Sequence, residues 1–263
     1  MITVGIDAGS RTIKAVLWDS EQRTILARRL CDQGAEQQSL AESLFADLLA
    51  EAGLERRAVG CMVATGYGRR LLDFCDTAVT EITCHAAGAS HFHPDAATLI
   101  DIGGQDSKLI RLDDGGKVRD FVMNDRCAAG TGRFLEVVAD RLNVPLSELG
   151  DYAKRSNAPA PISSICVVFA ETEIIGLLAQ GQSRENIIAG VQNSIVRRLA
   201  AMAGRTLDGP VYFTGGAALV SGMRQAFETV LQQPVSICQS PQFTGALGAA
   251  ILAARRQEMS SDS

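Results

Sequence analysis

Short apolar runs recur along the chain and predict two groups of β-strands. Stretches of four to eight residues rich in Val, Ile and Leu, bounded by Gly, Asp and Pro, favour buried strands. They cover 3–7, 13–18, 24–30 and 59–65 in the first group, then 98–101, 108–112, 117–123, 211–214 and 235–238 in the second. Apolar residues at helical spacing predict helices at about 37–52, from Glu81 toward His93, at 221–231 and from Phe243 onward.

The first strand of each group ends in the same motif, D-x-G-x-x-x-x-K. One copy begins at Asp7 and the other at Asp101, 94 positions later, and each lies on a hairpin that follows an apolar strand. Self-similarity of this kind is typical of a duplicated unit. The sequence therefore predicts an α/β fold made of two β-β-β-α-β-α halves.

The second copy is longer than the first because a helical segment interrupts it. We expect a first half at 1–94 and a second half at 95–263, with the insertion at about 127–205. The closing helix, 244–263, is available to pack back on the first half.

Two cysteines in the insertion each precede a predicted helix. Cys127 is followed by a turn of small residues and then by a helix whose apolar face begins at Phe134, and Cys166 directly precedes the helical run 167–178. A helix N-terminus favours a thiolate, because its unpaired N–H groups and dipole are positive there. Two such cysteines suggest half of a four-thiolate site, although zinc could also occupy one. The other five cysteines, at 31, 61, 75, 84 and 238, fit structural roles and form no C-x-x-C pair.

The composition excludes some classes of partner. Among 263 residues the formal net charge is −5, so no basic excess exists to attract nucleic acid. No segment approaches the roughly 20 apolar residues of a membrane helix, and the N-terminus lacks the pattern of a signal peptide. We therefore expect a cytoplasmic protein with reduced thiols and no membrane partner.

The duplicated hairpins favour a phosphate site. Glycine lets backbone N–H groups approach phosphate oxygens closely, and an aspartate at a strand end can hold hydrated Mg²⁺. A further Gly-Gly turn occurs at 215–216, whereas the chain contains no Walker-type loop and no G-x-G-x-x-G after its first strand.

These motifs carry a family resemblance over nearly the whole chain. DAGSRTIK, TGYGR, EITCHA, DIGGQDSK, NDRCAAGTGRFLE, the Cys166 segment, FTGGAA and TGALGAA resemble the activators of 2-hydroxyacyl-CoA dehydratases, a family that includes the ATPase subunits of benzoyl-CoA reductase. The resemblance implies actin-like ATPase halves, of the ribonuclease H-like type shared with sugar kinases and heat-shock chaperones, with a nucleotide cleft between them. It also implies a homodimer with one bridging [4Fe–4S] cluster. Such a dimer uses ATP to pass single electrons from a ferredoxin or flavodoxin to an iron–sulfur dehydratase or reductase.

The resemblance also assigns residues. Cys127 and Cys166 of each subunit would ligate the cluster. Asp7 and Asp101 would serve catalysis by holding Mg²⁺ through water, and Gln105 or an Asp-bound water would orient the hydrolytic water. The ATP or ADP would contact three segments: Gly9, Ser10, Arg11 and Lys14; Gly103, Gly104, Gln105 and Ser107; and Gly215, Gly216 and Ala217 at the adenosine.

Two other functions remain open at this point. A small-molecule kinase of the same superfamily would need an acceptor pocket and a catalytic Asp, and it would leave the paired cysteines without a task. A nucleotide-sensing scaffold would transfer no electron. The pattern assigns no role to Tyr67, Arg69 or the group His85, His91 and His93, of which the histidines fit solvated or capping positions better than ligand positions.

Overall fold

The computed structural model describes residues 1–163, 166–204 and 207–261. The strands are β1 (Ile2–Ala8), β2 (Thr12–Asp19), β3 (Thr24–Asp32), β4 (Val59–Thr65), β5 (Thr77–Ala78), β6 (Thr98–Ile102), β7 (Ser107–Leu112), β8 (Val118–Asn124), β9 (Val211–Thr214) and β10 (Val235–Ile237). The helices are α1 (Gln37–Ala52), α2 (Glu81–Phe92), α3 (Gly132–Leu142), α4 (Leu149–Lys154), α5 (Val167–Ala179), α6 (Arg184–Ala203), α7 (Met223–Leu231) and α8 (Thr244–Ser261). The short 3₁₀ turns within these ranges are η1 (Arg56–Ala58), η2 (Ala128–Gly130), η3 (Leu146–Glu148), η4 (Gly216–Leu219) and η5 (Pro241–Phe243).

The chain forms two compact units. Unit 1 comprises 1–96, 112–119 and the segment from Cys238 onward, and unit 2 comprises 97–111 and 120–237. Each unit is described by itself below. The predicted ends of the insertion, at 205, and of the closing helix, at 263, lie outside the described residues.

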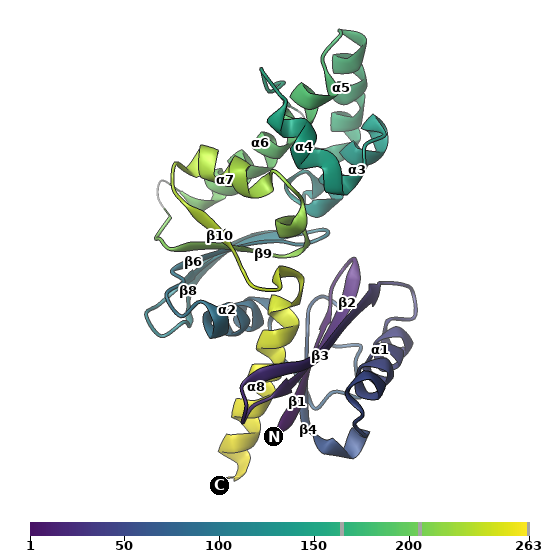
Figure 1. Cartoon of the computed structure of the whole chain (residues 1–263), viewed down its shortest axis with the longest axis vertical. Coiled ribbons are helices and arrows are strands. Elements are labelled where there is room, and N and C mark those ends of the chain that lie inside the picture. Colours follow the sequence, from purple (N-terminus) through teal and green to yellow (C-terminus); the bar gives the residue numbers. More distant parts are fainter. Residues whose placement is uncertain (164–165, 205–206, 262–263) are drawn as a thin grey trace. The chain divides into compact units, whose positions relative to one another are not determined.

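Unit 1 is built on a five-stranded sheet of order β3-β2-β1-β4-β5. Strand β1 pairs antiparallel with β2 and parallel with β4. It is buried over nearly its whole length, because α1 packs against one face of the sheet and α8 against the other (Figure 1). This accounts for the continuous apolar run at the N-terminus, which lacks the alternation of a half-exposed strand.

Helix α8 docks closely on unit 1 through glycines. A Cβ added at Gly5 of β1 would lie 1.9 Å from Ala246 O, and one added at Gly248 would lie 1.7 Å from Cys84 O of α2. Both distances are far below any real contact, so the backbones touch only because these residues lack side chains.

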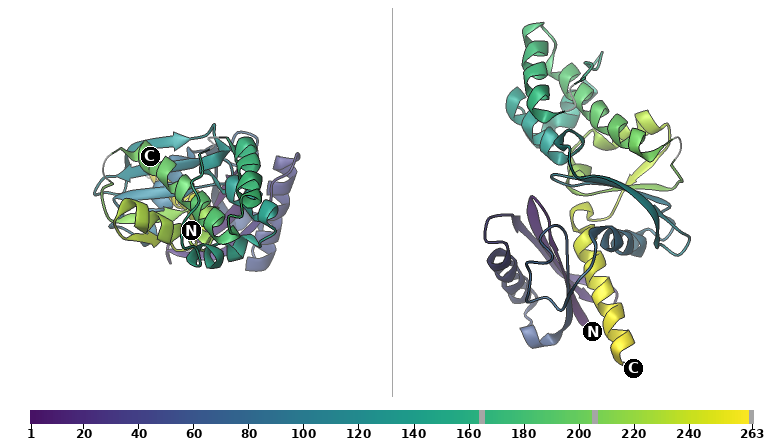
Figure 2. Two further views of the ribbon diagram at one scale, coloured as in Figure 1. Left: turned by 90° about the horizontal axis from the view of Figure 1, so that it is seen from above. Right: turned by 180° about the vertical axis from the view of Figure 1, so that it is seen from behind.

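Unit 2 repeats the sheet, with the order β10-β9-β6-β7-β8. Strand β6 pairs antiparallel with β7 and parallel with β9, as β1 does with β2 and β4. Helices α6 and α7 pack on this sheet (Figure 2). Side chains of α3 to α6 join those of the sheet in one main core, which includes Phe134, Ile188 and Phe213. The two sheets confirm the predicted duplication and the α/β class.

The predicted element boundaries hold to within one or two residues, but the two-residue strand β5 was not predicted. Cys127 is followed by η2, which is the predicted turn of small residues, and α3 begins only at Gly132. The reason is local, because Thr131 is extended (φ −132°, ψ 173°) and breaks the helical path after Gly130. Cys166, by contrast, directly precedes α5 as predicted.

Candidate functional site

Asp7 lies near the end of the central strand of unit 1 and is almost fully buried (3% exposed). The antiparallel register places Lys14 opposite it, and Lys14 Nζ lies 3.2 Å from Asp7 Oδ2. The other carboxylate oxygen, Oδ1, is buried and has no hydrogen-bond partner among the described residues. Because buried polar atoms are usually paired, this oxygen is a candidate for contact with a bound water or ion.

Glycines surround the Asp7 carboxylate. Gly66, which follows β4, has φ +86°, and a Cβ there would lie 2.5 Å from Asp7 Oδ1 and 2.6 Å from Ala8 O. A Cβ at Gly245 would lie 3.4 Å from Asp7 Oδ2. The sequence reasoning quoted the TGYGR and TGALGAA motifs but did not connect their glycines with Asp7. Their contact depends on the parallel β1–β4 pairing and on the docking of α8.

The first hairpin is closed tightly. Gly9 N donates to Thr12 O at 3.1 Å. Gln33 braces the turn from the side, because its Nε2 donates to Gly9 O at 2.7 Å and its N donates to Arg11 O at 2.9 Å. Ser10 is half-buried, and Arg11 is exposed at the tip.

Unit 2 reproduces this arrangement. Asp101 and Lys108 are both 2% exposed, with Lys108 Nζ 3.2 Å from Asp101 Oδ2. Gly103 N donates to Asp106 O at 3.0 Å and closes the second hairpin. Gly215, after β9, has φ +85°, and a Cβ there would lie 2.5 Å from Asp101 Oδ1 and 2.4 Å from Ile102 O. Gly215 is thus the counterpart of Gly66, a relation that the sequence analysis did not recognise.

The second hairpin differs from the first by one buried charge. Asp106 is 4% exposed, and its Oδ2 lies 2.7 Å from Lys108 Nζ, whereas Thr12 holds the equivalent place in unit 1. Asp106 lies inside the segment DIGGQDSK, but it is not part of the repeated D-x-G-x-x-x-x-K pattern and so was not predicted as a site residue. Two carboxylates therefore share one ammonium in unit 2, and the formal charges of Asp101, Asp106 and Lys108 together sum to −1.

The remaining predicted residues of unit 2 divide into surface and core. Gly103 and Gly104 are half-buried, and Gln105 is exposed at the hairpin tip. Ser107 is 1% exposed, and its Oγ has no hydrogen-bond partner among the described residues. Ala217, within η4, is 3% exposed and belongs to the core, so its side chain serves packing.

Cys127 and Cys166 differ from the other cysteines. Both precede a helical turn, and Cys166 is exposed, whereas Cys127 is half-buried as Cys31 and Cys75 are. Burial raises the pKa of Cys75 and of Cys84 to about 12, and it also raises the pKa values of Cys31 and Cys61. These four thiols therefore stay protonated at neutral pH, which disfavours them as metal ligands.

Helix α5, which Cys166 precedes, exposes large apolar side chains. Val168 is 68% exposed, Phe169 is 69% and Ile175 is 53%. A cluster of this kind on one helix is typical of an interaction surface.

A cavity of about 630 Å³ opens beside Cys127. It lies entirely in unit 2, and its apolar lining includes Met123, Leu199 and Met202. Arg126 and Arg198 add positive charge to its wall.

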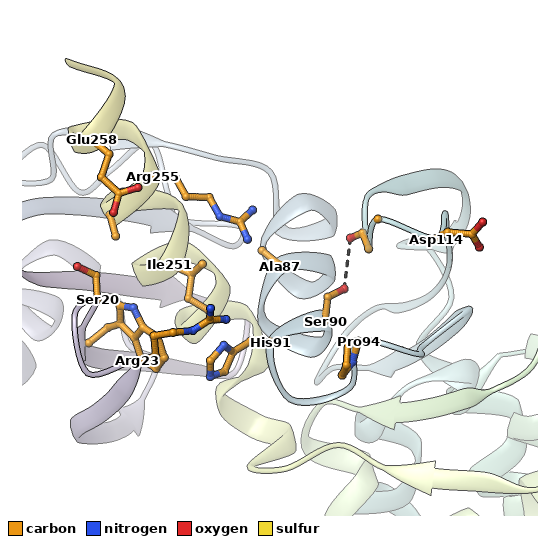
Figure 3. A pocket seen from close by; sticks show the side chains of 14 residues that line it. Ser20, Arg23, Ala87, Ser90, His91, Pro94, Asp114, Ile251, Arg255 and Glu258 are labelled. Atoms are coloured by element: carbon orange, nitrogen blue, oxygen red, sulfur yellow. Dashed lines mark hydrogen bonds between the residues drawn. The ribbon is translucent and has the colours of Figure 1, made fainter. Parts of the chain in front are cut away.

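Unit 1 contains a separate cavity of about 350 Å³ between α2, α8 and two turns. Figure 3 shows Arg23 and Arg255 directed into it, with Asp114 pointing away. Its lining includes no residue of the predicted phosphate, adenosine or cluster segments. His91 also lines it, in edge contact with Trp18 (4.8 Å between ring centroids), and burial next to Arg23 lowers the pKa of this imidazole.

The other two histidines lie apart from this cavity. His93 follows α2, and its Nε2 accepts a hydrogen bond from Gln239 N at 3.2 Å. His85 is buried, with Nε2 3.6 Å from Glu81 Oε1. The three histidines therefore have three different surroundings.

Comparisons with known proteins agree with this geometry. Residues 4–253 match the model of the BadF/BadG/BcrA/BcrD ATPase family. The chain belongs to this family. It is 45% identical over 255 residues to an activator of lactoyl-CoA dehydratase from Anaerotignum propionicum, covering 96% of this chain and 97% of the relative.

Two solved structures have the same fold. The activator of the 2-hydroxyisocaproyl-CoA dehydratase from Clostridium difficile with bound ADPNP matches with a TM-score of 0.92 and 37% identity, over 100% of this chain and 97% of the other. Component A of the (R)-2-hydroxyglutaryl-CoA dehydratase from Acidaminococcus fermentans matches with a TM-score of 0.92 and 38% identity, over 98% and 99%.

As a member of the BadF/BadG/BcrA/BcrD family, the chain is an ATPase with an actin-like fold. Its relatives include activators of dehydratases. In the part of the chain that the structure describes, no helix is both long and apolar enough to cross a membrane.

Proposed function

We propose that this protein is an ATP-dependent electron-transfer activator. In this proposal a homodimer carries one bridging [4Fe–4S] cluster and couples ATP hydrolysis to the one-electron reduction of an iron–sulfur partner enzyme, such as a 2-hydroxyacyl-CoA dehydratase. The observation that carries the proposal is that unit 2 combines a hairpin with a buried Asp–Lys pair and two cysteines that are not fully buried, each placed before a helical turn.

The nucleotide would be bound by the duplicated hairpins. Gly9, Ser10, Arg11 and Lys14 would contact phosphate in unit 1, and Gly103, Gly104, Gln105 and Ser107 in unit 2. The glycine cradles keep side chains away from the two aspartates. Gly215, Gly216 and the backbone of Ala217 would meet the adenosine.

Mg²⁺ fits the two aspartates. It prefers a few carboxylate oxygens and keeps several waters, and the buried, unpartnered Oδ1 of Asp7 matches a contact with such a water. Asp101 would contribute in the same way from unit 2. Gln105, exposed at its hairpin tip, would orient the hydrolytic water, with an Asp-bound water as the other candidate.

The [4Fe–4S] cluster fits the two accessible cysteines. Such a cluster takes four thiolates and supplies low-potential one-electron chemistry, whereas each chain offers two suitable thiols. An isologous contact between two copies repeats both ligands, which gives four. The exposed apolar residues of α5 lie directly after Cys166, where a second copy would cover them.

The partners follow from this chemistry. The acceptor would be an iron–sulfur dehydratase or reductase, in keeping with the names of the relatives. A ferredoxin or flavodoxin would supply the electron. We expect the protein to work in the cytoplasm, where its thiols stay reduced, and to be sensitive to oxygen.

Anaerobic purification tests the proposal. We expect a brown dimer with about four irons per dimer, as one such cluster requires, and an EPR signal after reduction with dithionite. Cys127→Ser and Cys166→Ser should each lose iron and colour. The matched control Cys31→Ser should keep both.

Electron transfer separates the remaining alternatives. With ATP, the reduced protein should reduce a purified lactoyl-CoA dehydratase-type acceptor, and it should fail to do so with ADP. ATP turnover that requires a small-molecule acceptor would identify a kinase instead. A cluster-bearing dimer that transfers no electron would identify a scaffold, and a colourless monomer would refute the proposal.

A further inference from the structure

The first turn of α3 is bonded directly to the second phosphate hairpin. Gly132 N donates to Gly103 O at 2.9 Å, and Arg133 N donates to Gly104 O at 3.0 Å. A Cβ at Gly132 would lie only 2.9 Å from Gly103 O, so the approach requires glycine. These amides belong to the helix end whose N–H groups have no partner inside the helix. In α3 they are therefore used to hold the hairpin.

The turn that carries Cys127 is fixed from its other side by Asn124, the last residue of β8. Asn124 Oδ1 accepts from Cys127 N at 3.1 Å, and Asn124 Nδ2 donates to Cys127 O at 2.7 Å. Within the turn, Thr131 N and Oγ1 both donate to Ala128 O, at 3.1 Å and 2.8 Å. One short, closed turn therefore joins Asn124 and Cys127 to the start of α3.

The hairpin can transmit phosphate binding through single peptide units. The carbonyl of Gly103 shares its peptide plane with the N–H of Gly104, and the carbonyl of Gly104 shares its plane with the N–H of Gln105. Each plane is rigid, and hydrogen bonds at its two ends polarise one another. A phosphate that accepts from either N–H would therefore alter the bonds to Gly132 and Arg133.

Cys166 has a different connection. The described hydrogen bonds of its segment are local: Ala170 N donates to Cys166 O at 2.9 Å, and Ser163 N and Oγ donate to Glu173 Oε1 at 2.9 Å and 2.7 Å. Helix α5 also shares the main core of unit 2 with α3 and forms the ion pair Arg141–Glu171 with it (3.1 Å). The core contacts are non-directional, and the ion pair is partly exposed and lies near the far end of α3, so neither joins Cys166 to the hairpin by hydrogen bonds.

We infer that Cys127 is the thiol that responds to the nucleotide, whereas Cys166 does not, and that Asn124 is the positioning residue for Cys127. The response passes from the hairpin through Gly132 and Arg133 to the turn 127–131. This inference rests on the proposed function only in requiring that the second hairpin binds phosphate.

Thiol alkylation of the full-length chain without its cluster tests the inference. The protein is treated with iodoacetamide under reducing, anaerobic conditions, with and without Mg·ADP, and the modification of each cysteine is followed by mass spectrometry. Mg·ADP should slow alkylation of Cys127 at least about fivefold, the lower end of typical coupling between sites. The rate at Cys166 should stay within about twofold, which is below that range.

Titration calorimetry on the same sample measures Mg·ADP binding, so it distinguishes failure of this inference from failure of the proposed function. If Mg·ADP binds but changes the Cys127 rate by less than twofold, or changes both cysteines alike, the inference is overturned and the nucleotide site stands. If Mg·ADP does not bind, the proposed function fails as well.

Asn124 variants test the positioning role. Asn124→Ala should accelerate alkylation of Cys127 and abolish its dependence on Mg·ADP, with unchanged nucleotide affinity. Asn124→Asp keeps the acceptor for Cys127 N and loses the donor to Cys127 O, so it should weaken the dependence of the alkylation rate on Mg·ADP only in part. This variant provides the test if the alanine variant does not fold. Asn193→Ala, on α6, is the control. A wild-type response in both Asn124 variants would overturn the assignment.

Discussion

At the residue scale, the chain pairs Asp7 and Asp101, the aspartates of the two repeated motifs, with a lysine on the neighbouring antiparallel strand. The Asp–Lys separation is 3.2 Å in both units, but only in unit 2 is the lysine fully enclosed and shared with a second carboxylate. Lys108 therefore offsets one of the two negative charges that Asp101 and Asp106 bring to this buried cluster.

Removal of this ammonium should be costly. Lys108→Met removes the buried ammonium that Asp101 and Asp106 share, and we expect the free energy of unfolding to fall by about 3–5 kcal/mol. Urea denaturation followed by circular dichroism measures the change. The exposed Lys117→Met is the control, and its effect should stay within about 0.5 kcal/mol. Equal stability of the two variants would contradict the argument.

Cys84 gives a pH dependence whose sign can be worked out. Burial raises the pKa of this thiol from its usual 9.0 to about 12. A group with a raised native pKa contributes stability below its unfolded pKa, and that contribution is lost as the pH rises toward the native pKa. Between about pH 9 and 12, wild-type stability should therefore fall by up to about 1.4 kcal/mol more per pH unit than that of Cys84→Ala. Parallel pH profiles from urea denaturation would refute this prediction.

At the element scale, unit 1 depends on the close approach of α2 and α8. Gly88 and Gly248 face this contact, since a Cβ at Gly88 would lie 2.0 Å from Thr244 O and one at Gly248 would lie 1.7 Å from Cys84 O. Such clashes involve backbone atoms, which cannot turn aside as a flexible side chain can.

An alanine at this crossing should separate the helices. We expect Gly248→Ala to lower the free energy of unfolding by at least about 3 kcal/mol, the upper part of the usual range for overpacking. The control is Gly176→Ala in α5, where an added Cβ would meet nothing within 4 Å. There the better helix propensity of alanine should raise helix stability by about 0.5–1 kcal/mol. Thermal unfolding of both variants in the cluster-free protein distinguishes the outcomes.

At the scale of the whole molecule, the apolar side of α5 should hold the proposed dimer together. The double substitution Val168→Ser, Phe169→Ser removes two side chains that are about two-thirds exposed in the single chain. Because exposed side chains add little to the stability of the monomer, the fold should persist while the dimer dissociates and the iron is lost. Light scattering after size exclusion, together with iron analysis, provides the measurement.

Leu71→Ser is the matched control for this experiment. Leu71 is also exposed (56%) but lies in unit 1, away from α5 in sequence. It should leave both the dimer and the iron content unchanged. A double variant that stays dimeric with full iron would show that α5 is not part of the interface.

The sequence by itself determined the strands other than β5, the duplication and the two cysteines that precede helical turns. Apolar runs and helical periodicity are local signals, so they can be read from neighbouring residues. The repeated D-x-G-x-x-x-x-K motif marks the position of the hairpin that follows the first strand of each group. The register that sets Lys14 against Asp7 and Lys108 against Asp101 was not predicted and comes from the antiparallel pairing in the structure.

Only the tertiary structure decided which distant residues complete these local motifs. Gly66 and Gly215 meet their aspartates through parallel pairing of strands that are far apart in the chain, and Gly245 does so through the docking of α8. Asn124 and Gly132 likewise hold the Cys127 turn by contacts that no periodicity records. The physical reason is that backbone hydrogen bonds and close glycine contacts depend on where the packed elements bring the chain together, whereas periodicity depends only on neighbours in sequence.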